Sequence, residues 1–291
     1  MKRVVPAVFC AVIGGMLSVV AAPAEDPALT ATLNRVGARV RDYYDHAQTI
    51  LSTETVRVQP LKSDLQPEGP PRRLVYDLRV EWSTAESPDG TPEPSVVREL
   101  ISVNGQKPKP DDEPECTDPR AVTVEPLFML LPEHRRDFLF SLGQVQRQNG
   151  RATRRLDYVS LPIGMSEPKW NKDCVSVPLE GKTRGSIWVD NDTDVVIRLE
   201  EHLIGMVDVR VPRDYARRNG QNWMYLERSD YSVKYEPITF DDPNETLTLP
   251  ATIDNVRVFR GNGTSRLRIT QSYSNYRRFL TRGRMLTPDN N

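Results

Sequence analysis

The residues best suited to binding a metal ion lie between positions 190 and 201. Asp190–Asp194 carries an acid at every second position, and Glu201 follows eleven residues after Asp190. This spacing matches the acid positions 1, 3, 5 and 12 of a calcium-binding loop. Such a loop needs glycine at its sixth position, where the chain has Val195, and helices on both sides, where the chain has strand-like segments. We therefore interpret Asp190–Asp194 as a polar hairpin turn and expect no metal site.

The patterns that would indicate catalysis are incomplete. Ser166 lies in the sequence GMSEP (164–168), in which proline replaces the second glycine of a nucleophile elbow. Glu200 and Glu201 are neighbours on an expected strand, so their side chains point to opposite faces and do not form an acid/base pair. The sequence contains no zinc-protease, phosphate-loop or dinucleotide-binding motif. We therefore expect a protein that is not an enzyme, with no catalytic residues and no cofactor.

Residues 1–24 are typical of a signal peptide. Lys2 and Arg3 are followed by the apolar run Val4–Val20, and then by Ala22-Pro23-Ala24, the small-x-small pattern that signal peptidase cuts. The apolar run is short for a bilayer-spanning helix, which needs about 20 residues. We expect cleavage after Ala24 and a periplasmic or secreted mature protein; the alternative is a retained N-terminal anchor.

Two cysteines remain when the segment that contains Cys10 is removed. Cys116 and Cys174 are then an even pair in an oxidising compartment, which predicts a disulfide between them. Closing a loop of this length would stabilise the fold by about 4 kcal/mol through the unfolded state. Two independent thiols are the alternative. Zinc is less favoured, because the three histidines are scattered without ligand spacing.

The charge of the chain argues against a nucleic-acid partner. Lys and Arg number 39 and Asp and Glu number 40, so the formal net charge is −1. Such a balance gives no overall field for nucleic acid or for an anionic membrane. Residues 25–291 are enough to form one sizeable β-rich domain.

Two segments are expected to be helical. Apolar residues such as Leu33, Val36 and Val40 recur at spacings of three and four over 28–51 and predict an amphipathic helix. The segment 125–142 is also predicted to be helical. Within it, Pro132 would start a second helix, which carries Phe138, Leu139 and Leu142 and ends at Gly143.

The rest of the chain has the two-residue alternation of strands. We expect strands at 76–83, 96–103, 155–160, 185–190, 195–204, 223–235, 251–260 and 265–274. Tyr76, Leu78, Val80 and Trp82 would share one face. The segments 84–95 and 106–120 are Pro-rich and are interpreted as insertions. Because the strands follow one another along the chain, the sheet should be mostly antiparallel with helices grouped on one side, an α+β fold.

Several short motifs resemble one family. The expected N-terminal helix leads into TETVRVQ (53–59), GSIWVD (185–190) is followed by VVIRLE (195–200), and YSNYRRF (273–279) follows the last expected strand. This order resembles the superfamily of exported bacterial proteins that includes the lipoprotein carriers LolA and LolB and the sensor RseB. The resemblance covers roughly residues 28–280.

The resemblance implies a curled antiparallel sheet, an incomplete barrel that helices close over an apolar cavity. It implies one LolA-like domain over 25–291, and a non-enzymatic envelope protein that binds or carries an acyl chain or a lipidated protein. A lipid or lipoprotein would be its partner, and peripheral association with the envelope is compatible with this. The alternative is an envelope interaction or scaffold protein with no cavity ligand. Aromatic and aliphatic strand residues would line the cavity, with Tyr76, Leu78, Val80, Trp82, Trp188, Tyr225, Leu267 and Ile269 as the candidates; the alternative is that they form a packed core.

Overall fold

A computed structural model describes residues 26–46, 50–83, 93–109, 126–148, 150–162, 167–171, 174–241, 244–261 and 263–278. The first half contains α1 (Pro27–His46), β1 (Ile50–Pro60), β2 (Arg72–Ser83), β3 (Glu93–Val103), the 3₁₀ helices η1 (Pro126–Leu130) and η2 (Arg135–Asp137), and β4 (Phe138–Gln148). The second half contains β5 (Arg151–Ser160), β6 (Lys169–Asn171), β7 (Cys174–Ser176), β8 (Thr183–Asp190), β9 (Val196–Leu203), β10 (Val207–Arg210), α2 (Arg213–Asn219), β11 (Trp223–Asp241), β12 (Asn244–Gly261) and β13 (Gly263–Arg278).

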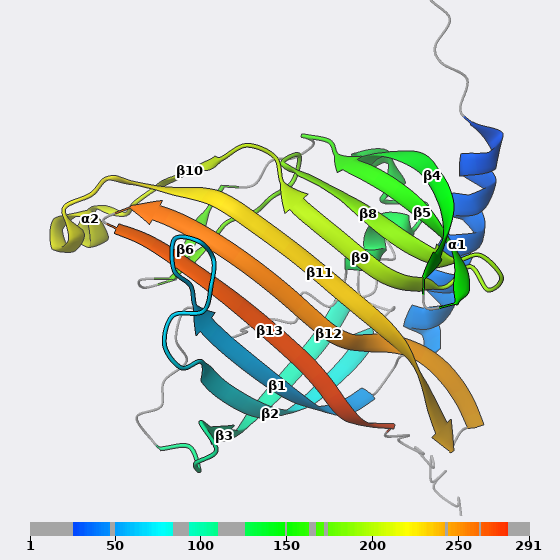
Figure 1. Ribbon diagram of the computed structural model, residues 1–291, viewed down its shortest axis with the longest axis horizontal. Coiled ribbons are helices and arrows are strands. Elements are labelled where there is room, and N and C mark those ends of the chain that lie inside the picture. The colour runs from blue at the N-terminus through cyan, green and yellow to red at the C-terminus, as the bar shows by residue number, and fades with distance from the viewer. Residues whose placement is uncertain are drawn as a thin grey trace, which may run out of the picture.

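One curled sheet dominates the fold (Figure 1). Its strand order is β3-β2-β1-β13-β12-β11-β9-β8-β5-β4, with β10 paired to β11. All of these pairings are antiparallel, and the edge strands β3 and β4 do not pair with each other, so the barrel is not closed. The expected α+β fold with a mostly antiparallel, incompletely closed sheet is confirmed.

The face of the sheet that packs against α1 and η1 is called here the inner face. Leu33, Val36, Val40 and Tyr44 of α1 join Leu130 of η1 and many strand residues in one large buried cluster. In Figure 1, α1 stands beside β4 and β5, whereas α2 lies at the opposite end of β11. The expected grouping of helical segments on one face therefore holds for α1 and η1. The short, polar α2 has no buried residue and was not predicted.

A close contact holds α1 against η1. The Arg135 guanidinium donates hydrogen bonds to the carbonyls of Leu33 and Leu130 and to Oδ1 of Asn34. A Cβ at Gly37 would lie 2.1 Å from the nearer Arg135 nitrogen and 2.7 Å from the Leu130 carbonyl oxygen. Glycine at position 37 therefore gives Arg135 the space to link the helix to the turn.

The predicted helix over 28–51 is wrong at its C-terminal end. The helix ends at His46, and Ile50 begins β1. Ile50 is buried against the same core as α1, so its apolar character fits the helical spacing although it belongs to the strand.

The predicted helix over 125–142 is also wrong. Only two short 3₁₀ turns form there, and Phe138, Leu139 and Leu142 lie in β4. Phe138 and Leu142 pack against the core, while Leu139 is 62% exposed, which is the alternation of a strand. Because Leu139 is apolar although it faces solvent, the two-residue period was hidden in the sequence.

Most of the Pro-rich segments lies outside the described residues. Of 84–95, residues 93–95 belong to β3, and of 106–120 only 106–109 are described. The predicted signal peptide and Cys116 lie outside the described residues as well, so the cleavage site and the disulfide with Cys174 stay predictions. Within the described part of the chain, no helix has the length and apolar character needed to cross a membrane.

Candidate ligand-binding cavity

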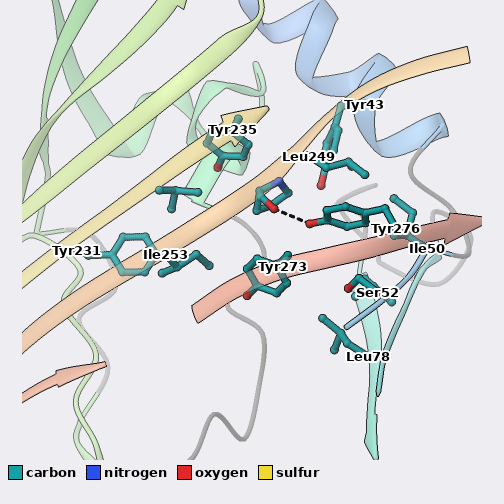
Figure 2. Close-up of a pocket in the computed structure, with 13 residues that line it drawn as sticks. Tyr43, Ile50, Ser52, Leu78, Tyr231, Tyr235, Leu249, Ile253, Tyr273 and Tyr276 are labelled. Carbon is teal, nitrogen blue, oxygen red and sulfur yellow. Dashed lines mark hydrogen bonds between the residues drawn. The ribbon is translucent and has the colours of Figure 1, made fainter. Parts of the chain in front are cut away.

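Two neighbouring cavities of very different size lie on the inner face. The first, called here the tyrosine cavity, is shown in Figure 2 and leaves only about 40 Å³ accessible to water. Its lining is Tyr43, Ile50, Ser52, Leu78, Val80, Tyr231, Val233, Tyr235, Leu249, Pro250, Ile253, Tyr273 and Tyr276. A space of this size holds a few water molecules at most. Side chains therefore already fill most of the tyrosine cavity.

The tyrosine rings are held in place by their own contacts. The Tyr276 hydroxyl donates a hydrogen bond to the Pro250 carbonyl, the dashed line in Figure 2. Burial raises the pKa of Tyr273 and of Tyr276 far above the ordinary tyrosine value. Both hydroxyls therefore stay protonated and act as hydrogen-bond donors at every physiological pH.

The second cavity, called here the large cavity, offers about 580 Å³ to water. Small-molecule sites in proteins typically measure about 300–1,000 Å³. The lining comes from η1, η2, the loop before β8 and strands β4, β5, β7, β8, β9, β11 and β12. It consists of Phe128, Met129, Asp137, Phe138, Ser160, Leu161, Ser176, Val177, Pro178, Leu179, Glu180, Gly181, Thr183, Glu201, Ser229, Tyr231, Asn255 and Arg257. Tyr231 lines both cavities, so the two lie next to each other.

One side of the large cavity is apolar. Phe128 and Phe138 meet edge to face with ring centres 6.4 Å apart, and Phe138 meets the ring of Tyr158 at 5.9 Å. Leu161 and Leu179 extend the apolar surface from the ends of the neighbouring segments. This side can remove an apolar ligand surface from water.

Other parts of the lining carry polar groups from the central strands. The Tyr158 hydroxyl donates a hydrogen bond of 2.9 Å to Oε2 of Glu201. Burial raises the pKa of the Glu201 carboxyl, while hydrogen bonds from Tyr158 and Thr183 lower it. Burial and the Glu201 charge also raise the pKa of Tyr158. The pair is therefore fixed within the wall, with Tyr158 as the donor.

Arg257 lies on the same inner face, opposite Ser229 in the β11–β12 register. Its side chain is exposed to solvent, yet protein surrounds it closely enough that burial lowers the pKa of its guanidinium. Both facts fit a position on the wall of a cavity. Among the described residues, Arg257 makes no hydrogen bond or ion pair.

The sequence candidates for the lining fall into three groups. Leu78 and Val80 line the tyrosine cavity. Tyr76, Leu267 and Ile269 belong to a separate apolar cluster around Val56, Val58 and Leu74, on the part of the inner face formed by β1, β2 and β13. The side chain of Trp82 lies outside the described part of the structure.

Trp188 and Tyr225 lie on the other face of the sheet. Trp188 faces outward because its neighbour Ile187 packs into the core, and the Arg198 guanidinium lies 5.0 Å from its ring centre. A bulge between Leu226 and Arg228 reverses the alternation of β11, so Tyr225 lies against Arg260 instead of in a cavity. A single inserted residue of this kind leaves no clear signal in the sequence.

The acidic segment 190–194 is the hairpin turn that the sequence predicts. Oδ1 of Asp190 accepts hydrogen bonds from the backbone N–H groups of Asp192 and Thr193, and Asp194 has a left-handed φ of 57°. Glu201 is directed into the large cavity, so it does not complete a calcium loop. The described residues contain no cluster of three or more potential metal ligands.

Glu200 and Glu201 occupy opposite faces, as their adjacency on a strand predicts. Glu200 pairs with Arg198 on the outer face, whereas Glu201 binds Tyr158 on the inner face. The sequence analysis did not identify the polar set of Glu201, Ser229, Asn255 and Arg257. The available signal for these residues in the sequence was that polar side chains interrupt the apolar alternation of three separate strands.

The fold and the site together define an α+β protein with an open curled sheet and an internal cavity. Solved structures similar to it include a LolA superfamily protein from Nitrosomonas europaea, at 9% identity and a TM-score of 0.38, over 88% of this chain and 98% of the other. A putative outer membrane lipoprotein-sorting protein domain from Vibrio parahaemolyticus matches at 11% identity and a TM-score of 0.41, over 86% and 92% of the two chains. A DUF1329 family protein from Desulfovibrio piger matches at 10% identity and a TM-score of 0.40, over 87% and 93%.

The description of the first of these structures names the LolA superfamily. No protein-family model matches the chain, and no curated protein sequence is significantly similar to it.

Proposed function

We propose that this chain is an exported, non-enzymatic protein of the cell envelope that binds an acyl chain, free or attached to a protein, in the large cavity. The observation that carries this proposal is the space of about 580 Å³ between the inner face, η1 and the loop before β8. The tyrosine cavity does not carry it, because its water-accessible space is about 40 Å³.

The apolar wall supplies the binding energy. Each methylene group that moves from water into an apolar site gains about 0.8 kcal/mol, so a chain of several carbons needs no charged group to bind. Phe128, Phe138, Leu161 and Leu179 offer such a surface next to open space. Catalysis is not required for this role.

A cavity-filling variant tests the proposal. Ser229 lines the large cavity, whereas Ser232 on the same strand is opposite Glu200, on the outer face. We expect saturable binding of a fluorescent fatty acid to the native protein and to S232F, and at least about tenfold weaker binding to S229F. Thermal unfolding of both variants checks that they remain folded. If native mass spectrometry finds no bound lipid and the native protein shows no saturable uptake, the proposal is wrong.

Export rests on the sequence of residues 1–24 and has its own test. N-terminal analysis of the mature protein from its own cells should begin at Glu25, because Ala22-Pro23-Ala24 precedes it. A mature protein that begins at Met1 would contradict export through a cleaved signal peptide.

A scaffold role is the second candidate, and the edge strand β3 favours it. Val97 and Ile101 are 58% and 49% exposed on the outer side of this strand. A partner that extends the sheet would cover them, since an edge strand has unpaired backbone groups. In cells that lack the native protein, S229F would still restore the phenotype if the scaffold role is correct, and V97D/I101D would not. The opposite result favours the cavity.

A further inference from the structure

We propose that the large cavity selects amphiphiles with an anionic headgroup, a carboxylate or a phosphate, and that Arg257 binds this headgroup. The inference rests on the proposed function and adds the chemistry of the ligand. It starts from a charged side chain that makes no hydrogen bond or ion pair among the described residues.

Arg257 differs from two arginines on nearby parts of the sheet, Arg260 and Arg268. Arg260 pairs with Glu227, and Arg268 lies 3.5 Å from a carboxylate oxygen of Asp254. Arg257 has no such partner among the described residues, although it lies on the inner face rather than at the rim. A guanidinium presents five donors in a planar fork that matches carboxylate and phosphate oxygens.

Two further polar side chains lie beside Arg257 without a hydrogen bond in the described structure. Ser229 is its direct neighbour across the β11–β12 pair, and Asn255 is two residues before it on β12. Oδ1 of Asn255 is buried and has no hydrogen-bond partner. This oxygen is an acceptor and cannot bind an anion, so Asn255 would reach the headgroup through its Nδ2 amide. The Arg257 guanidinium, the Ser229 hydroxyl and this amide can donate to one anion.

The acidic groups of the cavity do not cancel this arrangement. Glu201 is engaged by Tyr158 and Thr183, and burial favours its neutral form. Asp137 has Arg136 beside it, with Nε 3.7 Å from its carboxylate. Glu180 is exposed in the loop before β8. The described lining thus leaves one cation unmatched, in a cavity that apolar side chains also line.

Matched ligands with one chain length test the inference. Displacement of a neutral fluorescent probe measures the affinities of dodecanoate, dodecyl phosphate and 1-dodecanol. We expect one or both anions to bind the native protein about tenfold to a hundredfold more tightly than the alcohol, as a charge-assisted hydrogen bond predicts. The two anions identify which headgroup the site prefers.

Variants assign the preference to Arg257. R257Q should lose the preference, so that the anions and 1-dodecanol bind it with similar affinity, and R257K should keep part of the preference. The control R260Q changes an arginine of the same strand that lies against Tyr225 on the other face, and it should bind all ligands normally.

The outcomes separate the two proposals. Equal affinity for anions and alcohol, or a preference that survives R257Q, overturns the headgroup inference and leaves acyl-chain binding intact. If none of the three ligands displaces the probe, both proposals are wrong.

Discussion

Loss of the Arg98 side chain should destabilise the protein strongly, because it leaves a buried carboxylate without its charge partner. Glu54 is fully buried on β1. Its Oε2 accepts a hydrogen bond of 2.7 Å from Nε of Arg98, and its Oε1 accepts one of 3.3 Å from a terminal nitrogen of the same guanidinium. Gln271 and Tyr273 of β13 also donate to Glu54, at 2.7 and 3.3 Å.

The expected magnitude follows from this geometry. Removal of one member of a buried ion pair typically costs 3–5 kcal/mol, because the remaining charge stays out of water. In R98M the amide of Gln271 and the hydroxyl of Tyr273 still donate to Glu54, so we expect a loss near the lower limit, about 3 kcal/mol. The double variant E54L/R98M removes both charges and should recover most of this loss, since apolar replacement of a whole pair is often nearly neutral.

Equilibrium unfolding in urea, followed by tryptophan fluorescence, measures these differences. The control is R277M, which removes an exposed pair in which Arg277 lies 3.2 Å from Asp77. Exposed pairs contribute about 0–1 kcal/mol, so this variant should change stability little. If R98M and R277M lose the same small amount of stability, the argument from burial is refuted.

Three further predictions concern Glu201, Gly185 and the cysteines. Burial raises the pKa of folded Glu201 above its ordinary 4.5, so the contribution of Glu201 to stability is complete at pH below 4.5 and declines as pH rises through the raised pKa. Urea unfolding at several pH values should show that E201Q lacks this decline. Equal pH dependence of the two proteins would count against this prediction. A Cβ at Gly185 would lie 2.1 Å from a β9 carbonyl oxygen and 2.6 Å from the Tyr158 ring, so G185A should lose about 1–3 kcal/mol in the same assay, and native-like stability would contradict this. Without reductant, the denatured mature protein should take up no alkylating reagent if Cys116 and Cys174 are bonded, whereas two labels per chain would show two free thiols.

Much of the sheet could be predicted from the sequence, because most strands keep a wet face and a dry face. β2, β3, β5, β8, β9, β11, β12 and β13 were all expected, and their ends differ by only a few residues in most cases. The largest differences are in β11 and β12, which continue beyond 235 and begin before 251. Pro250 lies inside β12, and the register shifts where it meets Tyr235, an irregularity that accommodates the missing N–H.

The candidate site could not be predicted to the same extent. The lining of the cavity is formed by residues far apart in the sequence, such as Phe128, Glu201 and Arg257, and only the fold brings them together. The expectation that Tyr225 lines a cavity failed for a different reason, because the β11 bulge reversed its face. Alternation identifies which residues share a face locally, but it does not show where a bulge changes the face or where the sheet curls.

Two charged side chains on the inner face, Glu54 and Arg257, differ in whether the protein itself supplies their partners. Removing a charge from water is costly, so a charge that serves only the fold must be matched by partners inside the protein. Glu54 meets this condition through Arg98, Gln271 and Tyr273. Arg257 does not meet it among the described residues, and it keeps contact with solvent through the large cavity. An anion that replaces this solvent gives the guanidinium hydrogen bonds in place of those that it made with water. The apolar part of the lining then contributes only if the same ligand also carries a hydrocarbon chain.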